Sequence, residues 1–202
     1  MTLQSSPGWT VERQGLLTAS RMKDALDYLK SGKESEARRK YKIELVAERA
    51  YGRAVDHYVT PAMQRGLDEE PNARKAYEAT TGTLCGPARL IIHPRIDFFG
   101  GTPDAFVGPD GLAEFKVPQI ATFVTWTLGG VIPEDHLPQL NTQLAITGRQ
   151  WVDFCAYSPE SGKTFIRRLE RDEEAIANIE AAARAFLAEV DALFEQFTRA
   201  AA

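Results

Sequence analysis

The feature that most constrains the fold of this chain is a hairpin pattern near its middle. Residues 108–111 read Gly-Pro-Asp-Gly, a turn sequence, because Pro fixes one φ angle and Gly accepts a positive one. The segments on either side are short and apolar-rich, so they predict two strands joined by this turn. Side chains alternate between the two faces of a strand, and Glu114 and Lys116 therefore share one face. Asp104, at the start of the facing strand, adds a second carboxylate.

Two carboxylates and an ammonium on one sheet face are costly to bury, and a divalent cation among them would offset that cost. Mg²⁺ prefers oxygen ligands, and Asp104, Glu114 and the backbone carbonyl of Phe115 lie close together in this pattern. Lys116 would reach the same space and could orient or deprotonate a water, as phosphodiester hydrolysis requires. From the spacing alone, the alternative is a surface hairpin with an Asp cap and a cross-turn ion pair.

Composition narrows the classes of function. The 202 residues are 44% hydrophobic and 26% charged, which is typical of a soluble globular protein, and no apolar run approaches a membrane span in length. The first nine residues lack a signal-peptide pattern. Two cysteines without a Cys-x-x-Cys disfavour a structural zinc, an iron–sulfur cluster and a disulfide framework. The net charge of −4 argues against a generally basic nucleic-acid coat protein, and we expect a cytoplasmic protein without a membrane partner.

The order of the predicted elements indicates an α/β (α+β) fold. We expect Ser20 to cap the first helix, Pro61 to begin the third and Pro71 to kink or restart it. The apolar face of the second helix is expected to contain Ile43, Val46, Ala47, Ala50, Tyr51 and Ala54. The expected helices are 20–30, 34–58, 61–77, 133–147 and 172–201; the expected strands are 88–92, 96–99, 104–107, 112–117, 150–157 and 164–169; residues 121–128 are ambiguous.

These elements predict one domain over residues 1–202, with a mostly antiparallel sheet. Residues 1–8 are expected to form a loose leader, and residues 171–202 a C-terminal amphipathic helix whose apolar positions recur with the helical period. No internal repeat divides the chain.

Four blocks of residues occur in order along nearly the whole chain: Trp9-x-x-x-Arg13-x-Gly15-x-x-Thr18-Ala19-Ser20; Gly66-x-x-x-Glu70-x-x-Ala73-Arg74-x-x-Tyr77-Glu78; Thr102-Pro103-Asp104 with Glu114-Phe115-Lys116-Val117-Pro118; and Leu128-Gly129-Gly130, His136-Leu137-Pro138-Gln139-Leu140 and Thr147-Gly148 before the strand at 151–157. Together they resemble the phage lambda-type alkaline exonucleases, the YqaJ-like viral recombinase group of the PD-(D/E)xK nucleases. Thr102 stands where that family usually shows Ser. The resemblance implies a restriction-endonuclease-like fold, with a central mixed β-sheet flanked by helices, a helical N-terminal part and a long C-terminal helix.

The resemblance also implies catalytic roles. Asp104 resembles the metal-bridging aspartate, Glu114 the second ligand and Lys116 the catalytic lysine. Glu70 resembles a third acidic group that holds metal-bound waters, although a run of charges more often simply faces water. Gln139 matches a glutamine that orders the nucleophilic water or the lysine.

The implied cofactor is Mg²⁺, with Mn²⁺ as a substitute and two ions per site. A lysine beside such ions is pushed toward its neutral form, which agrees with a pH optimum above neutrality. Gln143 lies one helical turn after Gln139 and shares its face. The alternative for both glutamines is a polar stripe on a half-exposed helix, and for Gln143 we favour that alternative.

Arg13, Ser20 and Thr102 form a second predicted group. A guanidinium offers bidentate donors and a helix N-terminus favours anions, so the group suits a terminal phosphate. In the resembling family this pocket receives the 5′-phosphate of the strand being digested. The competing role of Ser20 as a helix cap is compatible with this one.

Other DNA contacts are weaker predictions. Arg38 and Arg39 belong to a basic stretch that would touch the DNA backbone, with a solvated helix face as an equal alternative. Met63 would act as an apolar wedge at the terminal base pair, with core packing as the alternative.

The function that the resemblance implies is 5′-to-3′ exonuclease activity on double-stranded DNA ends. The products would be 5′-mononucleotides and 3′ single-stranded tails for annealing recombination. It also implies a ring-shaped homotrimer, a single-strand annealing protein as partner, and a phage or prophage protein in a bacterial host cell. The alternatives are a structure- or site-specific endonuclease with the same core and a non-catalytic DNA-binding relative.

Overall fold

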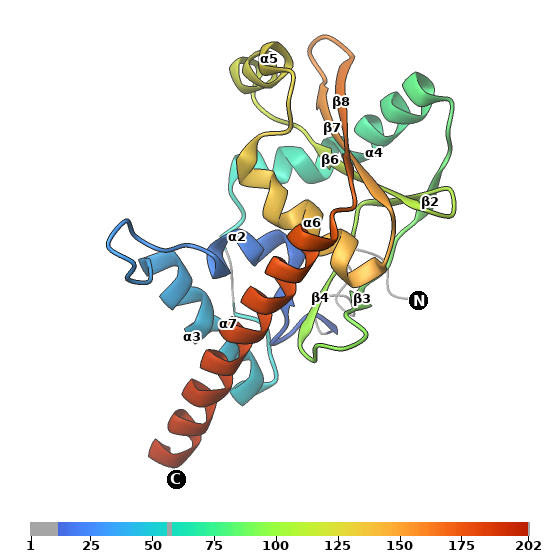
Figure 1. Cartoon of the computed structure of the whole chain (residues 1–202). Helices are drawn as coiled ribbons and strands as arrows, with labels where there is room; N and C mark the ends of the chain where they lie inside the picture. Colours follow the sequence, from blue (N-terminus) through green and yellow to red (C-terminus); the bar gives the residue numbers. More distant parts are fainter. Residues whose placement is uncertain (1–11, 56–57, 202) are drawn as a thin grey trace.

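The computed structural model describes residues 12–55 and 58–201, and its main sheet confirms the mixed α/β fold (Figure 1). The predicted leader at residues 1–8 lies outside these described residues, and so do Trp9 and His57. The sheet has the strand order β2-β5-β6-β7-β8, in which β6 and β7 are parallel and the other neighbours antiparallel. The strands are β2 (Cys85–Pro87), β5 (Ala105–Val107), β6 (Gly111–Lys116), β7 (Trp151–Ser158) and β8 (Lys163–Glu170).

The predicted hairpin forms between β5 and β6, with Ala105 opposite Ala113 and Val107 opposite Gly111. Its turn places Gly108 at φ 55°, the left-handed region that glycine adopts without a steric penalty. Side chains alternate along β6 as expected, because Leu112 packs into the large core while Ala113 and Phe115 pack into a smaller one.

The prediction of strands at 88–92 and 96–99 is only partly correct. The chain instead forms a second, small sheet from β1 (Leu17–Thr18), β4 (Phe99–Gly101) and β3 (Ile91–Ile92), in the order β1-β4-β3. Residues 88–90 therefore connect two short strands that belong to different sheets, and residues 93–98 form a turn between β3 and β4. In this turn Phe98 adopts a positive φ of 56°.

The helices begin and end largely at capping residues. Ser35, Thr60 and Asp172 accept backbone N–H bonds at the N-termini of α3, α4 and α7, and glycines in the left-handed conformation follow α3, α4, α5 and α6. The helical elements are η1 (Ala19–Arg21), α2 (Met22–Ala25), α3 (Glu36–Tyr51), α4 (Pro61–Thr81), α5 (Ile120–Gly129), η2 (Glu134–His136), α6 (Leu137–Thr147) and α7 (Glu173–Ala200).

Three helix predictions need correction. The first helix is much shorter than 20–30, and Ser20 lies inside the 3₁₀ turn rather than at a cap. The second ends at Tyr51, because Gly52 turns the chain into the left-handed conformation. The third is not restarted at Pro71, since α4 continues through it to Thr81.

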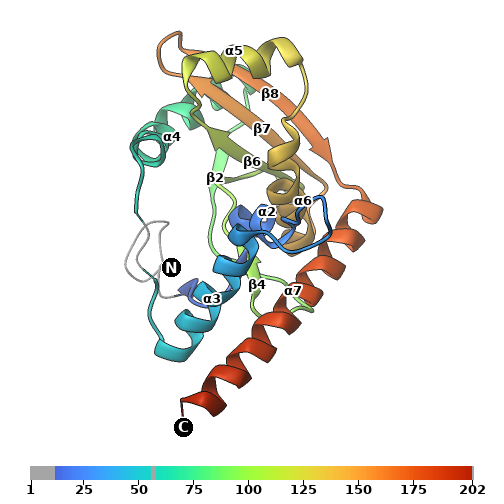
Figure 2. The ribbon, with the colours of Figure 1, turned by 90° about the vertical axis from the view of Figure 1, so that its left-hand side faces the viewer.

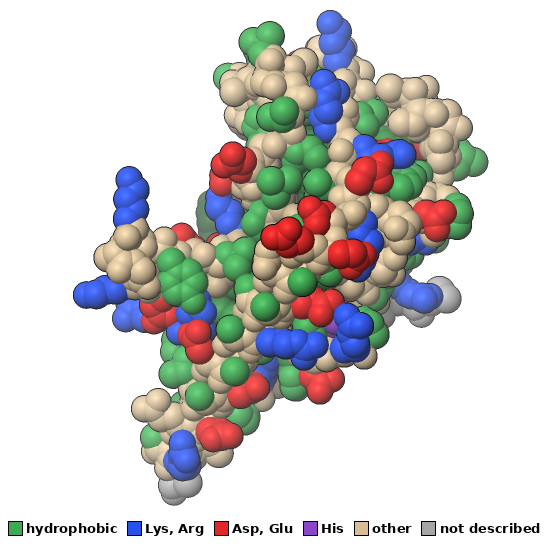
Figure 3. All heavy atoms as spheres, viewed as in Figure 1, with side chains coloured by type: hydrophobic (Ala, Val, Ile, Leu, Met, Phe, Trp, Pro, Cys, Tyr) green, Lys and Arg blue, Asp and Glu red, His purple; other side chains and the backbone are tan. Residues whose placement is uncertain are grey.

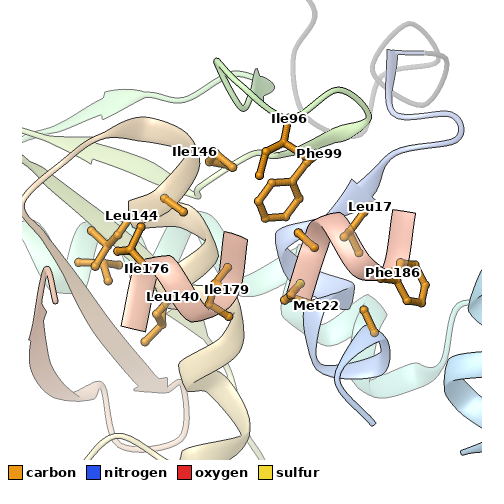
Figure 4. Packing of buried hydrophobic residues seen from close by; sticks show 14 of the residues in the cluster. Leu17, Met22, Ile96, Phe99, Leu140, Leu144, Ile146, Ile176, Ile179 and Phe186 are labelled. Carbon is orange, nitrogen blue, oxygen red and sulfur yellow. The ribbon is translucent and has the colours of Figure 1, made fainter. Parts of the chain in front are cut away.

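Two layers of helices enclose the main sheet (Figure 2). α4 packs on one face, where Ala73 and Tyr77 contact the small cluster around Phe115. On the other face lie α5 and α6, and α7 runs across α6 from the end of β8 to α3. Figure 4 shows Leu140 and Leu144 of α6 against Ile176 and Ile179 of α7 in the large core. The part of the sheet around β6 therefore lies between α4 on one face and α6 on the other.

The face that α3 turns to the core is only partly the predicted one, since Val46 is buried as expected. Ile43 is 53% exposed and Tyr51 66%, whereas Tyr41 and Leu45 are buried. Arg38 shares this buried side, since ion pairs to α7 satisfy its charge. Within the described ranges, none of the helices combines the length and apolar character needed to cross a bilayer.

Candidate active site

A cavity of about 540 Å³ opens where β6, α4, α6 and the N-terminal segment meet. Residues from all four sequence blocks line it, although those blocks are far apart in the chain. The lining includes Arg13, Ser20, Met63, Glu70, Thr102, Asp104, Glu114, Phe115, Lys116, Trp126 and Gln139. The structure therefore brings the predicted catalytic residues and the predicted phosphate-binding residues into one space.

The hairpin places charged side chains in this cavity. The Phe115 backbone N–H donates to Asp104 Oδ2 at 2.7 Å, which ties the start of β5 to β6. The Lys116 ammonium donates to Glu114 Oε1 at 2.5 Å, as the shared face predicts. Glu114 is only 2% exposed, so its charge depends on these partners rather than on water.

Two amides of α6 complete the contacts of Glu114. Gln139 Nε2 donates to Glu114 Oε1 at 2.6 Å, and its own side-chain carbonyl accepts from the Lys116 ammonium at 3.2 Å. Gln143 Nε2 donates to Glu114 Oε2 at 2.6 Å. Gln143 is fully buried, and the prediction that it belongs to a half-exposed polar stripe is wrong. The i,i+4 spacing of the two glutamines was the signal that could have revealed this.

The electrostatics of the cluster follow from its burial. Burial, and next the charge of Glu114, raise the pKa of the Asp104 carboxyl well above its ordinary value. Burial also raises the pKa of Glu70, and the Glu114 charge adds to the effect. Burial alone would lower the pKa of Lys116, but the charges of Glu114 and Asp104 outweigh it, so the pKa is raised. The lysine is thus an ammonium that partly neutralises a carboxylate-rich site.

Glu70 lies on α4 and lines the same cavity, close enough for its charge to couple with those of Asp104 and Lys116. One turn further along α4, Arg74 Nη2 donates to the backbone carbonyl of Asp104 at 2.6 Å. A second link, from the Tyr77 hydroxyl to Asp153 Oδ2 at 2.7 Å, holds α4 against β7. Sequence reasoning had not assigned either of these α4 contacts.

Of the acidic side chains that line the cavity, Asp104 and Glu114 are suited to bind a hard divalent cation directly, and Glu70 is not. Asp104 and Glu114 offer carboxylate oxygens whose mutual repulsion a cation would relieve, and the Phe115 carbonyl belongs to the same strand end. Among residues 12–55 and 58–201, no group of three or more His, Cys, Asp or Glu side chains is arranged to hold a metal ion. Glu70 lines the cavity without joining a three-residue ligand set, and the predicted role of this residue, to hold metal-bound waters, does not require direct ligation.

The three predicted phosphate-binding residues line the same cavity. Arg13 Nη2 is 3.4 Å from the Ser20 hydroxyl, which is in turn 3.4 Å from the Thr18 hydroxyl. Thr102 lies two residues before Asp104 and faces the same space. A guanidinium and two hydroxyls at this position suit an anion.

The weaker predictions of DNA contacts have different outcomes in the structure. Arg38 is 2% exposed and its guanidinium is held by both oxygens of Glu189 at 2.8 Å, which corrects its assignment to the DNA backbone. Arg39 is exposed and makes no such bond among the described residues. Met63 is 55% exposed at the cavity wall, so core packing does not explain it. Acidic and basic side chains intermix over α7 on the face shown in Figure 3, which therefore presents no continuous basic field.

Trp126 at the cavity and the histidines His93 and His136 outside it have structural surroundings. His136 packs on Trp126 and Phe154 at centroid distances of 5.2 and 5.0 Å. Burial lowers the pKa of His136 to about 4, so this side chain is neutral at pH 7. His93 is buried beside Glu180, at 3.2 Å. Neither lies in a ligand arrangement with another histidine.

The mixed sheet with two carboxylates and a lysine on adjacent strands defines the chain as a protein of the PD-(D/E)xK nuclease fold. A model of the YqaJ-like viral recombinase domain matches residues 8–150, and the chain belongs to this family. Among curated proteins no match is found.

Solved structures agree with this family. An alkaline exonuclease, LHK-Exo from Laribacter hongkongensis, is 38% identical over 97% of this chain and 98% of its own, with a TM-score of 0.87. The same enzyme in complex with dAMP gives a TM-score of 0.88 at the same identity and coverage. A phage-related exonuclease from Haemophilus somnus 129PT shares the fold alone, with 13% identity over 90% of this chain and 96% of its own and a TM-score of 0.70.

Proposed function

We propose that this protein is a divalent-metal-dependent exonuclease that digests linear double-stranded DNA from the 5′ end. It releases 5′-mononucleotides and leaves 3′ single-stranded tails for annealing recombination. The observation that carries the proposal is the common cavity, in which the Asp104–Glu114–Lys116 cluster and the Arg13–Ser20–Thr102 group share one space. The likeness to an alkaline exonuclease over 97% of the chain supports it.

Asp104, Glu114 and the Phe115 backbone carbonyl would hold Mg²⁺, with Mn²⁺ as a substitute and two ions per site. When bound, the metal supplies positive charge to the scissile phosphate and lowers the pKa of water. The buried carboxylate pair suits this role because a cation replaces a like-charge repulsion with two attractions. Glu70, on the facing helix, would order the outer water shell.

The remaining residues act on the substrate and the proton. Lys116 is within hydrogen-bond reach of Glu114 and Gln139, so its ammonium is oriented toward the reacting phosphate region and can move a proton there. Gln139 bridges the two charged groups and keeps their geometry fixed. Positioned charges of this kind stabilise the charge that builds on phosphoryl oxygens in the transition state.

In the same cavity, Arg13, Ser20 and Thr102 would receive the 5′-phosphate of the digested strand. Met63, exposed at the wall, would wedge against the terminal base pair. This arrangement explains a preference for ends, because an internal phosphodiester lacks the extra negative charge of a terminal phosphate. Arg39 remains a candidate backbone contact.

The assembly follows from the family resemblance. We propose a ring-shaped homotrimer around the DNA, a single-strand annealing protein as partner, and a cytoplasmic setting in a bacterial host that carries the gene as phage or prophage. Size-exclusion chromatography with light scattering measures the first of these directly.

The deciding experiment digests linear duplexes that carry a 5′-phosphate at one end only, with and without Mg²⁺, and sizes the products. We expect mononucleotides from the phosphorylated end and no digestion without the metal. Closed circular DNA should resist. Cleavage of circles would favour a structure- or site-specific endonuclease, and full activity of Asp104→Ala would exclude the proposed catalytic centre in favour of a contaminating nuclease.

A further inference from the structure

Gln143 is a fully buried amide on α6, a helix whose buried side chains are otherwise apolar except for Thr142. Leu140 and Leu144, on the same helix, belong to the large core. The Gln143 carbonyl Oε1 has no hydrogen-bond partner among the described residues. A buried carbonyl without a partner carries a desolvation cost that Leu or Met would avoid. The presence of an amide here is therefore explained by the one bond that it does make.

That bond is the donation from Gln143 Nε2 to Glu114 Oε2 at 2.6 Å. The acceptor is a carboxylate that is 2% exposed, so the bond is charge-assisted and shielded from water. The other carboxylate oxygen, Oε1, already accepts from Lys116 and Gln139. Glu114 is thus held at both oxygens, but by different residues.

The lone pairs of the Glu114 carboxylate show how many acceptor positions remain. A carboxylate offers about four acceptor positions, two on each oxygen. Lys116 and Gln139 use both positions on Oε1, and Gln143 uses one on Oε2. One position remains, and it is on Oε2. Without Gln143, rotation of the carboxylate about the Cγ–Cδ bond would be opposed only by the two donors on Oε1.

We propose that Gln143 is a positioning residue for the metal centre: it sets the rotation of the Glu114 carboxylate, so that the remaining lone pair of Oε2 is presented to the divalent cation. The inference rests on the proposed function and deepens it, because it assigns the ligand atom of Glu114 and the residue that orients it. Gln143 acts only through Glu114 and touches neither the cation nor the DNA.

The test measures Mn²⁺ binding to the full-length, metal-free protein by isothermal titration calorimetry. The variants Gln143→Met and Gln143→Leu replace the amide with an apolar side chain of similar volume. Residues that orient a metal ligand typically change metal affinity 10–100-fold when they are replaced, and we expect this loss in both variants. The unfolding midpoint should fall by a few degrees at most, because loss of the bond to Glu114 Oε2 is partly offset by removal of the partnerless carbonyl.

Thr142→Val is the matched control. Thr142 is also fully buried on α6, but its hydroxyl donates to the Pro138 carbonyl within the helix. Its Mn²⁺ affinity should remain within about two-fold of the wild-type value, since it has no bond to Glu114.

Two results would overturn the inference while leaving the proposed function intact: wild-type Mn²⁺ affinity in both Gln143 variants, or an equal loss of affinity in Thr142→Val, which would assign the effect to helix packing. A wild-type protein that binds no Mn²⁺ at millimolar concentration would overturn the metal site and this inference together.

Discussion

Lys116 lies between two acceptors, the Glu114 carboxylate at 2.5 Å and the Gln139 side-chain carbonyl at 3.2 Å. Its side chain is 26% exposed, so its ammonium faces the cavity while its stem is covered. In the proposed reaction this amine moves a proton at the phosphate and contributes little to the affinity for DNA. The two effects can be separated by one substitution.

We expect Lys116→Ala to lower the single-turnover cleavage rate by roughly 10²–10⁴-fold, the range for a lost general acid–base group. The affinity for a 5′-phosphorylated duplex, measured by fluorescence anisotropy in Ca²⁺, should change by no more than about three-fold. Lys163→Ala, at an exposed position on β8, is the control and should cleave normally. A comparable loss of DNA affinity and rate in Lys116→Ala would instead make the lysine a binding residue.

A second prediction at the scale of single residues concerns Arg13. Its guanidinium is 3.4 Å from the Ser20 hydroxyl in the cavity. A charge-assisted bond to a phosphate contributes about 1.5–3 kcal/mol, so Arg13→Ala should reduce the ratio of kcat/KM for 5′-phosphorylated over 5′-hydroxyl duplexes by roughly 10–100-fold. An unchanged ratio would show that the pocket assignment is wrong, whatever the change in absolute rate.

At the scale of the elements, α3 and α7 are joined by a charged contact. It includes Arg38, a residue predicted to contact DNA. Glu189 of α7 accepts from both Arg38 and Lys42 of α3, each at 2.8 Å. The Arg38 side chain is 3% exposed and that of Glu189 is 41% exposed. The hydrogen bond to Arg38, opposed by burial and supported by Lys42, lowers the pKa of Glu189 to about 2.

This shift predicts how stability depends on pH. Because the folded pKa is below that of the unfolded chain, the ionised Glu189 stabilises the fold fully above about pH 4.5, and the contribution is lost as the pH falls toward 2. We expect Glu189→Gln to lower the free energy of unfolding by about 1–2 kcal/mol at pH 7, after allowing for the exposure of the carboxylate. The difference from wild type should shrink between pH 4.5 and 3, as measured by urea denaturation. Glu195→Gln, an exposed carboxylate on the same helix, should show no such convergence.

At the scale of the whole molecule, the metal site couples distant segments. Asp104, just before β5, and residues of β6, α4 and α6 line the cavity together with Arg13 and Ser20 of the N-terminal segment. Removing the repulsion between Asp104 and Glu114 should therefore stabilise the entire fold and not one loop.

We expect Mg²⁺ at 10 mM to raise the thermal unfolding midpoint by several degrees, since a ligand at 100 times its Kd adds about 2.7 kcal/mol. Asp104→Asn should abolish this rise, while the midpoint of the metal-free variant stays at or above that of the wild type because a buried carboxylate has been neutralised. An equal Mg²⁺ effect in both proteins would place the cation elsewhere.

Much of this architecture was predictable from local patterns. Turn chemistry at 108–111 and strand alternation predicted the hairpin, and α7 follows its apolar period from Ile176 to Val190. Prediction failed where two faces of a helix were both plausible. In α3, Ile43 and Tyr51 are exposed while Tyr41 and Leu45 are buried, and ion pairs with α7 allow Arg38 and Lys42 to be buried beside them.

The sequence by itself determined the hairpin at 104–117 and the shared face of Glu114 and Lys116, because backbone geometry sets the period of a strand and a turn needs only adjacent residues. Only the tertiary structure decided which polar groups are buried together. Gln143 meets Glu114 across 29 positions and Arg38 meets Glu189 across 151, and no local pattern encodes such partners. The physical reason is that a buried charge is stable only beside its partner, and the partner is chosen by the packing of the whole chain.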